Sequence, residues 1–167
     1  MSERVLIAYG SKHGSTAETA DAIAGMLRRH GLEVDLSEAA RVQSLEGYDR
    51  VVIGGSIYTG RWHPDARDFV KRFGDELSTT PVAIYAMGPK TSEPDDLAAA
   101  RKQLDASLRK LPDVGADPIA IFGGVINPAK LHFPFSRMPA TDARDWQKIQ
   151  AFADAVYSGS VQAAGIG

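Results

Sequence analysis

The sequence predicts an α/β fold: a three-layer sandwich whose five-stranded parallel sheet has the strand order 2-1-3-4-5 and carries helices on both faces. Short apolar runs alternate with longer amphipathic segments along the 167 residues, and this alternation is typical of a parallel sheet with helical crossovers. Right-handed crossovers leave few topologies, of which this strand order is a common one. Ligands then lie at the carboxyl ends of the strands, beside strands 1 and 3.

The first half of the chain supplies three of these strands and one helix. Residues 5–9 are an apolar run, which indicates a buried strand. Residues 15–30 repeat apolar side chains at helical spacing, and Gly31 follows as a C-terminal cap. Residues 32–36 alternate like a half-exposed edge strand. A buried strand at 51–53 ends in two glycines.

The second half continues the alternation. A helix is predicted over residues 64–77, which begin with proline, and a strand over 82–86. A second helix follows at 93–110, where two aspartates in the first turn complement the helix dipole. The fifth strand is expected at 118–122. After a loop with three prolines, the last helix is expected at 142–157.

Residues 1–158 are expected to form one domain, and residues 159–167 a flexible tail.

The composition limits the functions that the chain could have. The chain has no cysteine, which excludes disulfides, thiolate metal sites and thiol nucleophiles, so redox chemistry would need a cofactor. The net charge of −2 gives no field for nucleic acid. The histidines lack metal-ligand spacing, and the N-terminal apolar run is too short for a membrane span, so a cytoplasmic protein is expected.

The loop after the first strand has the features of a phosphate site. A helix N-terminus offers unpaired N–H groups and the positive end of a dipole. Gly14 lets the backbone curl close to an anion, and hydroxyl side chains add donors. The predicted phosphate-binding residues are Ser11, Lys12, His13, Gly14, Ser15 and Thr16. The alternative is a capping box of Ser15 and Glu18, which needs no ligand.

The loop after the third strand combines aromatic rings with glycine. A flat ring such as an isoalloxazine needs apolar walls and a few backbone partners. Trp62 or Tyr58 would stack on it, and Gly60 would let a peptide reorient. The alternative is that Trp62 packs under the next helix, which His63 starts. The predicted binding residues here are Ser56, Ile57, Tyr58, Thr59, Gly60 and Trp62.

The loop after the fourth strand begins with Met87, Gly88 and Pro89. Strands 1, 3 and 4 are neighbours in the expected order, so their loops meet at one edge of the sheet. The backbone of this third loop would meet the pyrimidine edge of a flavin. An ordinary strand-to-helix turn is the alternative, and the residues alone leave both open.

These loops resemble those of the flavodoxin family. The segment from Ser11 to Thr16 is similar to its FMN-phosphate loop, with His13 in place of the usual hydroxyl residue and Ser15 in place of asparagine. The resemblance implies a flavodoxin-like fold and FMN as the cofactor. Because FMN carries the reactivity, no side chain is expected to act as a nucleophile, and no catalytic residue is assigned.

A closer resemblance is to the menaquinone-dependent protoporphyrinogen dehydrogenases. It rests on residues 48–57, on Gly60, His63 and residues 69–71, and on residues 145–146 and 152–153. It implies an FMN-dependent oxidoreductase that passes electrons from a reduced substrate, such as a porphyrinogen, to a quinone or another acceptor. That subfamily carries a long basic and aromatic insertion after strand 5, linked to membrane or porphyrin contact. The segment 126–141 is shorter here, and a loop covering the sheet edge is its alternative.

Two other functions stay open. An electron-carrier flavodoxin resembles this fold but usually has a strongly acidic docking surface, whereas this chain places Lys12, Arg61 and Lys90 on the three loops. A non-enzymatic flavodoxin-like binding module without FMN is the second alternative. The expected partner is a redox protein or a small-molecule substrate, and the sequence leaves the oligomeric state open.

Overall fold

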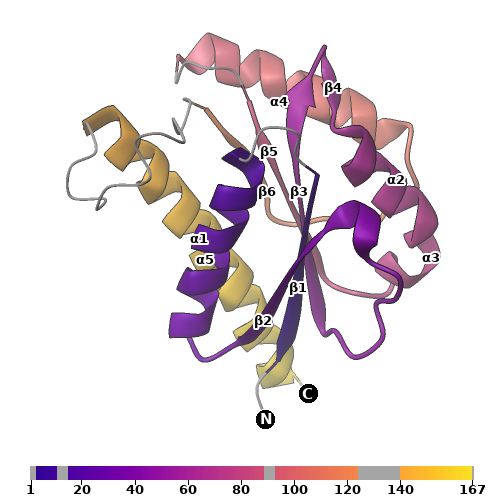
Figure 1. The fold of residues 1–167 in the computed structure, drawn as a ribbon. Helices are drawn as coiled ribbons and strands as arrows, with labels where there is room; N and C mark the ends of the chain where they lie inside the picture. Colours follow the sequence, from indigo (N-terminus) through magenta and orange to yellow (C-terminus); the bar gives the residue numbers. More distant parts are fainter. Residues whose placement is uncertain (1–2, 11–14, 89–92, 124–139, 167) are drawn as a thin grey trace.

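The computed structural model describes residues 3–10, 15–88, 93–123 and 140–166. They form a central sheet between two layers of helices (Figure 1). The predicted fold class is thereby confirmed. Within the described ranges, no helix is both long enough and apolar enough to cross a membrane.

The sheet has the predicted order along its main path. Five parallel strands lie in the order β2-β1-β3-β5-β6. In chain order they are β1 (Arg4–Gly10), β2 (Glu33–Glu38), β3 (Arg50–Tyr58), β5 (Val82–Met87) and β6 (Ile119–Phe122). The central strands β1, β3 and β5 are almost wholly buried, since helices cover both faces of a parallel sheet.

A sixth strand was not predicted. The segment from Ser56 to His63, which was expected to be a loop, instead continues β3 to Tyr58 and turns back as β4 (Arg61–Trp62), which pairs antiparallel with β3. Thr59 (φ 49°) and Gly60 (φ 77°) form the turn between them. Two consecutive positive φ values are the geometry of a two-residue hairpin turn, for which Asn-Gly is the usual sequence signal. Because Thr-Gly stands here in place of Asn-Gly, the sequence does not indicate the hairpin.

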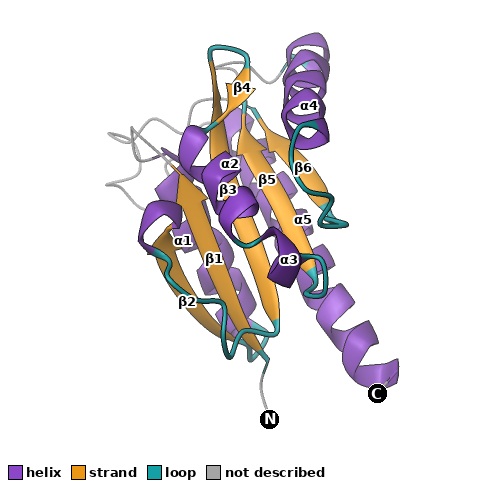
Figure 2. Ribbon diagram, turned by 90° about the vertical axis from the view of Figure 1, so that its right-hand side faces the viewer, coloured by secondary structure: helices purple, strands orange, loops and turns teal. Residues whose placement is uncertain are grey.

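Helices cover the sheet unequally on its two faces (Figure 2). One face carries α1 and α5, and the other carries α2, α3 and α4. Their bounds are α1 (Ser15–Arg29), α2 (Pro64–Arg72), α3 (Gly74–Leu77), α4 (Pro94–Arg109) and α5 (Ala140–Ile166), with a 3₁₀ turn η1 (Ala39–Arg41) after β2.

Two helices differ from their predicted bounds. The helix expected over 64–77 breaks at Phe73, where the backbone leaves helical geometry before Gly74. The last helix continues to Ile166, past its predicted end at residue 157. The flexibility expected for residues 159–167 stays a prediction.

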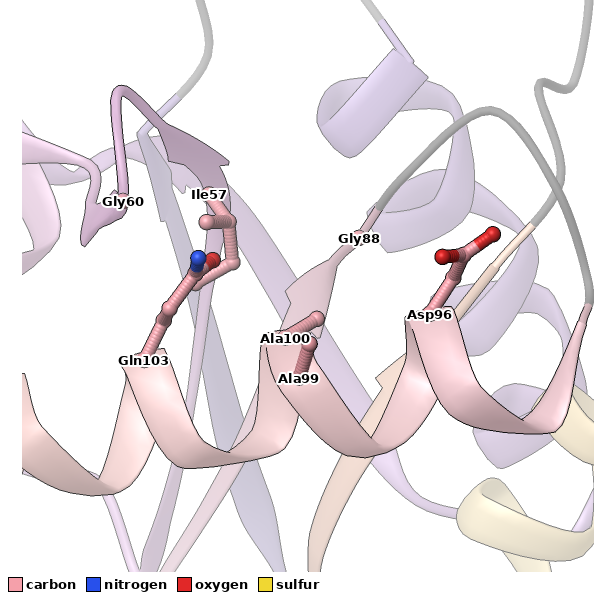
Figure 3. Close-up of a pocket in the computed structure, with 7 residues that line it drawn as sticks. All are labelled: Ile57, Gly60, Gly88, Asp96, Ala99, Ala100 and Gln103. Atoms are coloured by element: carbon pink, nitrogen blue, oxygen red, sulfur yellow. The ribbon is translucent and has the colours of Figure 1, made fainter.

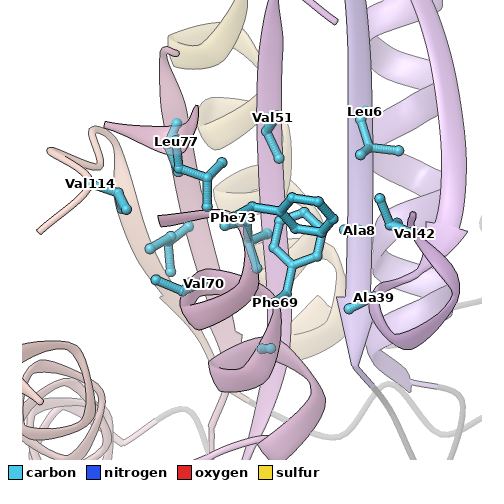
Figure 4. Packing of buried hydrophobic residues seen from close by; sticks show 14 of the residues in the cluster. Leu6, Ala8, Ala39, Val42, Val51, Phe69, Val70, Phe73, Leu77 and Val114 are labelled. Atoms are coloured by element: carbon cyan, nitrogen blue, oxygen red, sulfur yellow. The ribbon is translucent and has the colours of Figure 1, made fainter. Parts of the chain in front are cut away.

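Each layer has its own apolar core. The first cluster joins α1 and α5 to one face of the sheet through residues such as Ile23, Val52 and Phe152. The second joins α2 and α4 to the opposite face, where Phe69 and Phe73 pack against the sheet (Figure 4). These two clusters hold the carboxyl ends of β1, β3 and β5 in fixed positions relative to α1 and α4.

The contact between α1 and α5 gives a pH-dependent prediction. The His30 ring stacks on Tyr157 with centroids 4.0 Å apart, and its Nε2 lies 3.2 Å from Asp154 Oδ1. Hydrogen bonds from Gln150 and His30 hold the pKa of Asp154 below its ordinary value. A lowered folded-state pKa stabilises the fold above the unfolded pKa of about 3.9, and this stability is lost as the pH falls through the folded pKa.

We therefore expect Asp154→Asn to reduce the free energy of unfolding at pH 6 by less than about 1 kcal/mol, since the pair is partly exposed. Urea unfolding should show the difference between the two proteins shrinking as the pH falls below the unfolded pKa of about 3.9 and through the lower folded-state pKa. A stability difference that is constant between these pH values would contradict this account of Asp154.

Candidate functional site

The candidate site lies at the carboxyl edge of the sheet, where β1, β3 and β5 end side by side. Strand β1 ends at Gly10 and strand β5 ends at Met87. Between them, β3 runs on into the hairpin that it forms with β4. The helix α1 begins at Ser15, as predicted, and presents its N-terminus at this edge. In doubly wound sheets this edge is where ligands bind.

Thr16, in the first turn of α1, is fully buried. Its hydroxyl oxygen Oγ1 has no hydrogen-bond partner among the described residues. A buried polar atom without a partner is destabilising by about 1–3 kcal/mol, so such atoms are uncommon in folded proteins. The Thr16 hydroxyl is therefore an unsatisfied buried donor in the first turn of the helix.

Strand β5 contacts the first turn of α1 and fixes its position. The buried Tyr85 hydroxyl donates a hydrogen bond of 2.9 Å to the Thr16 carbonyl oxygen. Burial raises the pKa of the Tyr85 phenol, so the group keeps its proton and remains a donor. Thr19 Oγ1 adds a weaker contact of 3.5 Å to the Met87 sulfur. Strand β5 thus fixes the position of the start of α1.

His63 connects the end of β1 to α2. Its Nδ1 accepts a hydrogen bond of 3.0 Å from the Asp65 backbone N–H, which caps α2. Because Nδ1 accepts, the neutral ring carries its proton on Nε2. A Cβ added at Gly10 would lie 2.8 Å from His63 Nδ1, so the glycine lets the ring pack against the end of β1.

The two aromatic residues of the hairpin lie in different environments. Tyr58 is 58% exposed and is the exposed large apolar side chain of the described part of the chain. Trp62 is fully buried, its backbone N–H donates to Ser107 Oγ on α4 at 3.2 Å, and its carbonyl accepts from Arg67 Nε at 2.8 Å. A ring could stack on Trp62 only if the hairpin moved. The stacking expected for Trp62 stays a prediction, and Tyr58 is the accessible ring.

A cavity of about 300 Å³ lies between the hairpin and α4 (Figure 3). Predicted residues from two loops border it, namely Ile57 and Gly60 of the hairpin and Gly88 after β5. Its opposite wall was not predicted. That wall consists of four α4 residues, Asp96, Ala99, Ala100 and Gln103.

The sequence did not indicate that these α4 residues line a cavity, and the reason is physical. Their spacing of three, four and seven residues puts them on one helix face, but two alanines between polar residues are also typical of a solvent-exposed surface. The aspartates at the start of the helix have an ordinary role beside the dipole, which the structure bears out by placing Asp95 and Asp96 in the first turn. This helix face lines a cavity only because the β3–β4 hairpin lies opposite it.

Some predicted residues lie outside the described part of the chain. These are Ser11, Lys12, His13, Gly14 and Pro89, together with most of the segment 126–141. The side chain of Ser15 is likewise not described. Ser56 is half-buried in β3, and the Thr59 hydroxyl donates to the Tyr58 carbonyl oxygen at 2.7 Å. The binding roles of all these residues stay predictions.

Comparison with known proteins identifies a family. The model of the flavodoxin domain family matches residues 6–138. A curated relative, protoporphyrinogen IX dehydrogenase [quinone] of Escherichia coli K12, is 33% identical over 108 residues. This match covers 60% of this chain and 60% of the relative, so it spans less than two thirds of that protein's length.

Solved flavodoxins have the same fold. Oxidised flavodoxin 2 of Bacillus cereus superposes with a TM-score of 0.62 and 22% identity, over 93% of this chain and 99% of its own. The flavodoxin of Streptococcus pneumoniae TIGR4 superposes with a TM-score of 0.61 and 19% identity, over 93% and 99%. At these identities the superpositions show the shared architecture of the two layers and the sheet.

Proposed function

The chain belongs to the flavodoxin domain family and its cofactor is FMN; on that premise we propose that it is an FMN-dependent oxidoreductase of the protoporphyrinogen dehydrogenase type. It would pass electrons from a reduced substrate to a quinone or another acceptor. When bound, FMN supplies the redox chemistry that the side chains of a cysteine-free chain lack. The residues of the carboxyl edge bind it, orient it and keep water from one side.

The residues at the start of α1 fit the phosphate of FMN. The helix N-terminus offers N–H groups and a partial positive charge. The Thr16 hydroxyl is buried and lacks a partner among the described residues, so a phosphate oxygen there would satisfy it. This orphaned hydroxyl is the observation that carries the proposed cofactor site. Ser11 to Ser15 are proposed to complete the contacts.

The hairpin and the end of β5 fit the ring of the same molecule. β1 and β5 are two strands apart, which is about 10 Å at the usual spacing of neighbouring strands. A ligand with its phosphate at α1 therefore reaches the hairpin and Gly88 with its other end. Tyr58 offers an exposed ring for stacking, and Gly60 offers a peptide without a side chain in the way.

The choice between an enzyme and an electron carrier rests on two observations. The curated relatives are named as quinone-dependent dehydrogenases, and a net charge of −2 gives little of the acidic field that guides a carrier to basic partners. The carrier is the second candidate, because the solved neighbours of this fold are named flavodoxins. A cytoplasmic location is part of the proposal.

The test is turnover by the FMN-loaded protein under exclusion of oxygen. Protoporphyrinogen IX and a soluble quinone are supplied, and porphyrin fluorescence is followed. We expect fluorescence to rise only when protein, FMN and quinone are all present. No rise with porphyrinogen, combined with rapid reduction of the loaded protein by a flavodoxin reductase, would contradict the dehydrogenase and favour the carrier. Failure to bind FMN would contradict both.

A further inference from the structure

The turn at the tip of the β3–β4 hairpin has a strained backbone. Thr59 has a φ of 49° and Gly60 a φ of 77°, so both residues lie in the left-handed region. Glycine adopts such angles freely, whereas a β-branched residue such as threonine rarely does. The Thr59 hydroxyl donates to the carbonyl oxygen of the preceding residue at 2.7 Å, a contact that stays within the turn. A strained backbone persists where the surrounding structure holds it, so the hairpin needs an anchor next to its tip.

That anchor is the backbone of Trp62 in β4. In the part of the chain that the structure describes, β4 pairs with β3 alone, so its other edge has no strand beside it. Residue pairs along an antiparallel ladder alternate between pairs that exchange hydrogen bonds and pairs whose N–H and C=O groups point outward. Trp62 pairs with Ile57 and directs both backbone groups outward, since each bonds to the side chain of a helix residue.

Two helices supply those side chains. The Trp62 N–H donates to Ser107 Oγ of α4 at 3.2 Å, and Arg67 Nε of α2 donates to the Trp62 carbonyl oxygen at 2.8 Å. Trp62 and Ser107 are both buried, and a buried backbone N–H without a partner is costly. Both helices contact β4 (Figure 1). We call Ser107 and Arg67 the Trp62 clamp.

The indole of Trp62 fixes the same point. A Cβ built on Gly55 would lie 2.7 Å from Trp62 Nε1 and 2.9 Å from the Ala66 Cβ, so the ring lies directly against the β3 backbone beside α2. Trp62 thus has its side chain and both of its backbone groups held. Gly60 is two residues away along the chain, and two residues of extended chain span at most about 7 Å. The clamp therefore restricts the position of the turn.

The turn lies where the ring of FMN is proposed to bind. It follows β3 at the carboxyl edge of the sheet, and Tyr58 beside it is 58% exposed. Stacking and backbone contacts with a flat ring depend on positions accurate to on the order of 0.5 Å. The phosphate end of the site is at α1, which packs on one face of the sheet, whereas α2 and α4 pack on the other (Figure 2). The clamp therefore acts on the ring end alone.

We propose that Ser107 and Arg67 are positioning residues for the flavin ring. Through the backbone of Trp62, they hold the strained Thr59–Gly60 turn in the conformation that receives the ring, and neither touches the cofactor. The proposal rests on the proposed function for the identity of the ligand. It adds to the site two helix residues that lie outside the three loops and that the sequence did not indicate.

The test measures the affinities of Ser107→Ala for FMN and for riboflavin, by flavin fluorescence. This substitution removes the acceptor of the Trp62 N–H. We expect both flavins to bind about fivefold more weakly, and by the same factor, because they share the ring and the phosphate contacts are unchanged. Arg67→Met, which keeps the aliphatic stem, should give the same pattern.

The matched control is Ser78→Ala. Ser78 follows α3 at the opposite edge of the sheet, and its hydroxyl donates to the Asp75 carbonyl oxygen at 2.6 Å. Its removal also deletes a hydrogen bond from a serine to the backbone, but away from the hairpin. We expect Ser78→Ala to leave both flavin affinities within about twofold of the wild type.

Thr59→Asn distinguishes positioning of the turn from a general structural role. Asn-Gly is a preferred sequence for a two-residue hairpin turn with positive φ at both positions, so the substitution removes strain that the clamp otherwise opposes. In the Thr59→Asn background, we expect Ser107→Ala to weaken flavin binding by less than about twofold rather than by about fivefold. A residue that only stabilised the fold would cause the same loss in both backgrounds.

Three results would overturn the proposal: unchanged affinity for both flavins in Ser107→Ala, a loss for FMN without a loss for riboflavin, or an equal loss with and without Thr59→Asn. The second result would place the effect at the phosphate. If the wild-type protein binds neither flavin, the proposed function fails. Amide hydrogen exchange at Trp62 and Gly60 in the flavin-free protein then decides the clamp by itself, with faster exchange expected in Ser107→Ala and equal exchange contradicting it.

Discussion

Replacing Gly54 by alanine is expected to destabilise the protein severely. A Cβ at this position would lie 2.1 Å from Cζ and 2.3 Å from the hydroxyl of Tyr85, its partner in the β3–β5 register. Tyr85 is fully buried and its ring packs against Phe122 and Phe152, so it can move only by displacing these neighbours. Overpacking of this kind costs about 1–3 kcal/mol or more, and displacing the ring also breaks its hydrogen bond to Thr16, worth about 1 kcal/mol.

We expect Gly54→Ala to lower the free energy of unfolding by about 3 kcal/mol or more, measured by urea unfolding. The matched control is Gly25→Ala in α1, where a Cβ meets nothing within 4 Å and where alanine should stabilise the helix by about 0.5–1 kcal/mol. Adding Tyr85→Leu to Gly54→Ala should recover part of the loss. Additive effects of the two substitutions would show that the clash is not the cause.

Replacing Thr16 by valine is expected to change stability and FMN binding in opposite directions. Valine keeps the shape of threonine and removes a buried hydroxyl that has no partner among the described residues. Without FMN, the variant should be as stable as the wild type or about 1 kcal/mol more stable, because an unsatisfied group is gone. With FMN, a hydrogen bond to a charged phosphate is lost, worth about 1.5–3 kcal/mol.

This loss corresponds to an FMN dissociation constant about ten- to a hundredfold higher, measured by quenching of FMN fluorescence. Thr16→Ser is the matched control. It keeps the hydroxyl and should bind FMN almost as well as the wild type, while losing about 1 kcal/mol of stability with the buried methyl group. Unchanged FMN affinity in Thr16→Val would remove Thr16 from the cofactor site.

The strand order was predictable because buried parallel strands are continuous apolar runs, and their order follows from few allowed topologies. Residues 51–53 and 82–86 are such runs, and both lie in central strands. The hairpin was not predictable, since Thr59 adopts a positive φ without the usual Asn-Gly signal. After the end of α2 at Phe73, Gly74 lies so close to Pro112 that an added Cβ would come within 3.0 Å of it, and this neighbour is distant in sequence.

Those parts of the candidate site that lie directly after the ends of neighbouring strands were predictable from the sequence. The start of α1 and the residues Ile57, Gly60 and Gly88 come to the same edge because their strands are neighbours. The environments of Trp62 and Tyr58 depend on which face of the hairpin each occupies, and this requires knowing that the hairpin exists. The α4 wall depends on how a helix packs across the sheet, which no local pattern specifies.

The most direct test of the central claim, that the start of α1 binds the phosphate of FMN, is a comparison of FMN with riboflavin, which lacks only that phosphate. Both are titrated into the cofactor-free protein, and flavin fluorescence reports binding. We predict that FMN binds at least a hundredfold more tightly than riboflavin, and that added salt reduces the difference. Equal affinity for the two flavins, or no binding of either, would contradict the account.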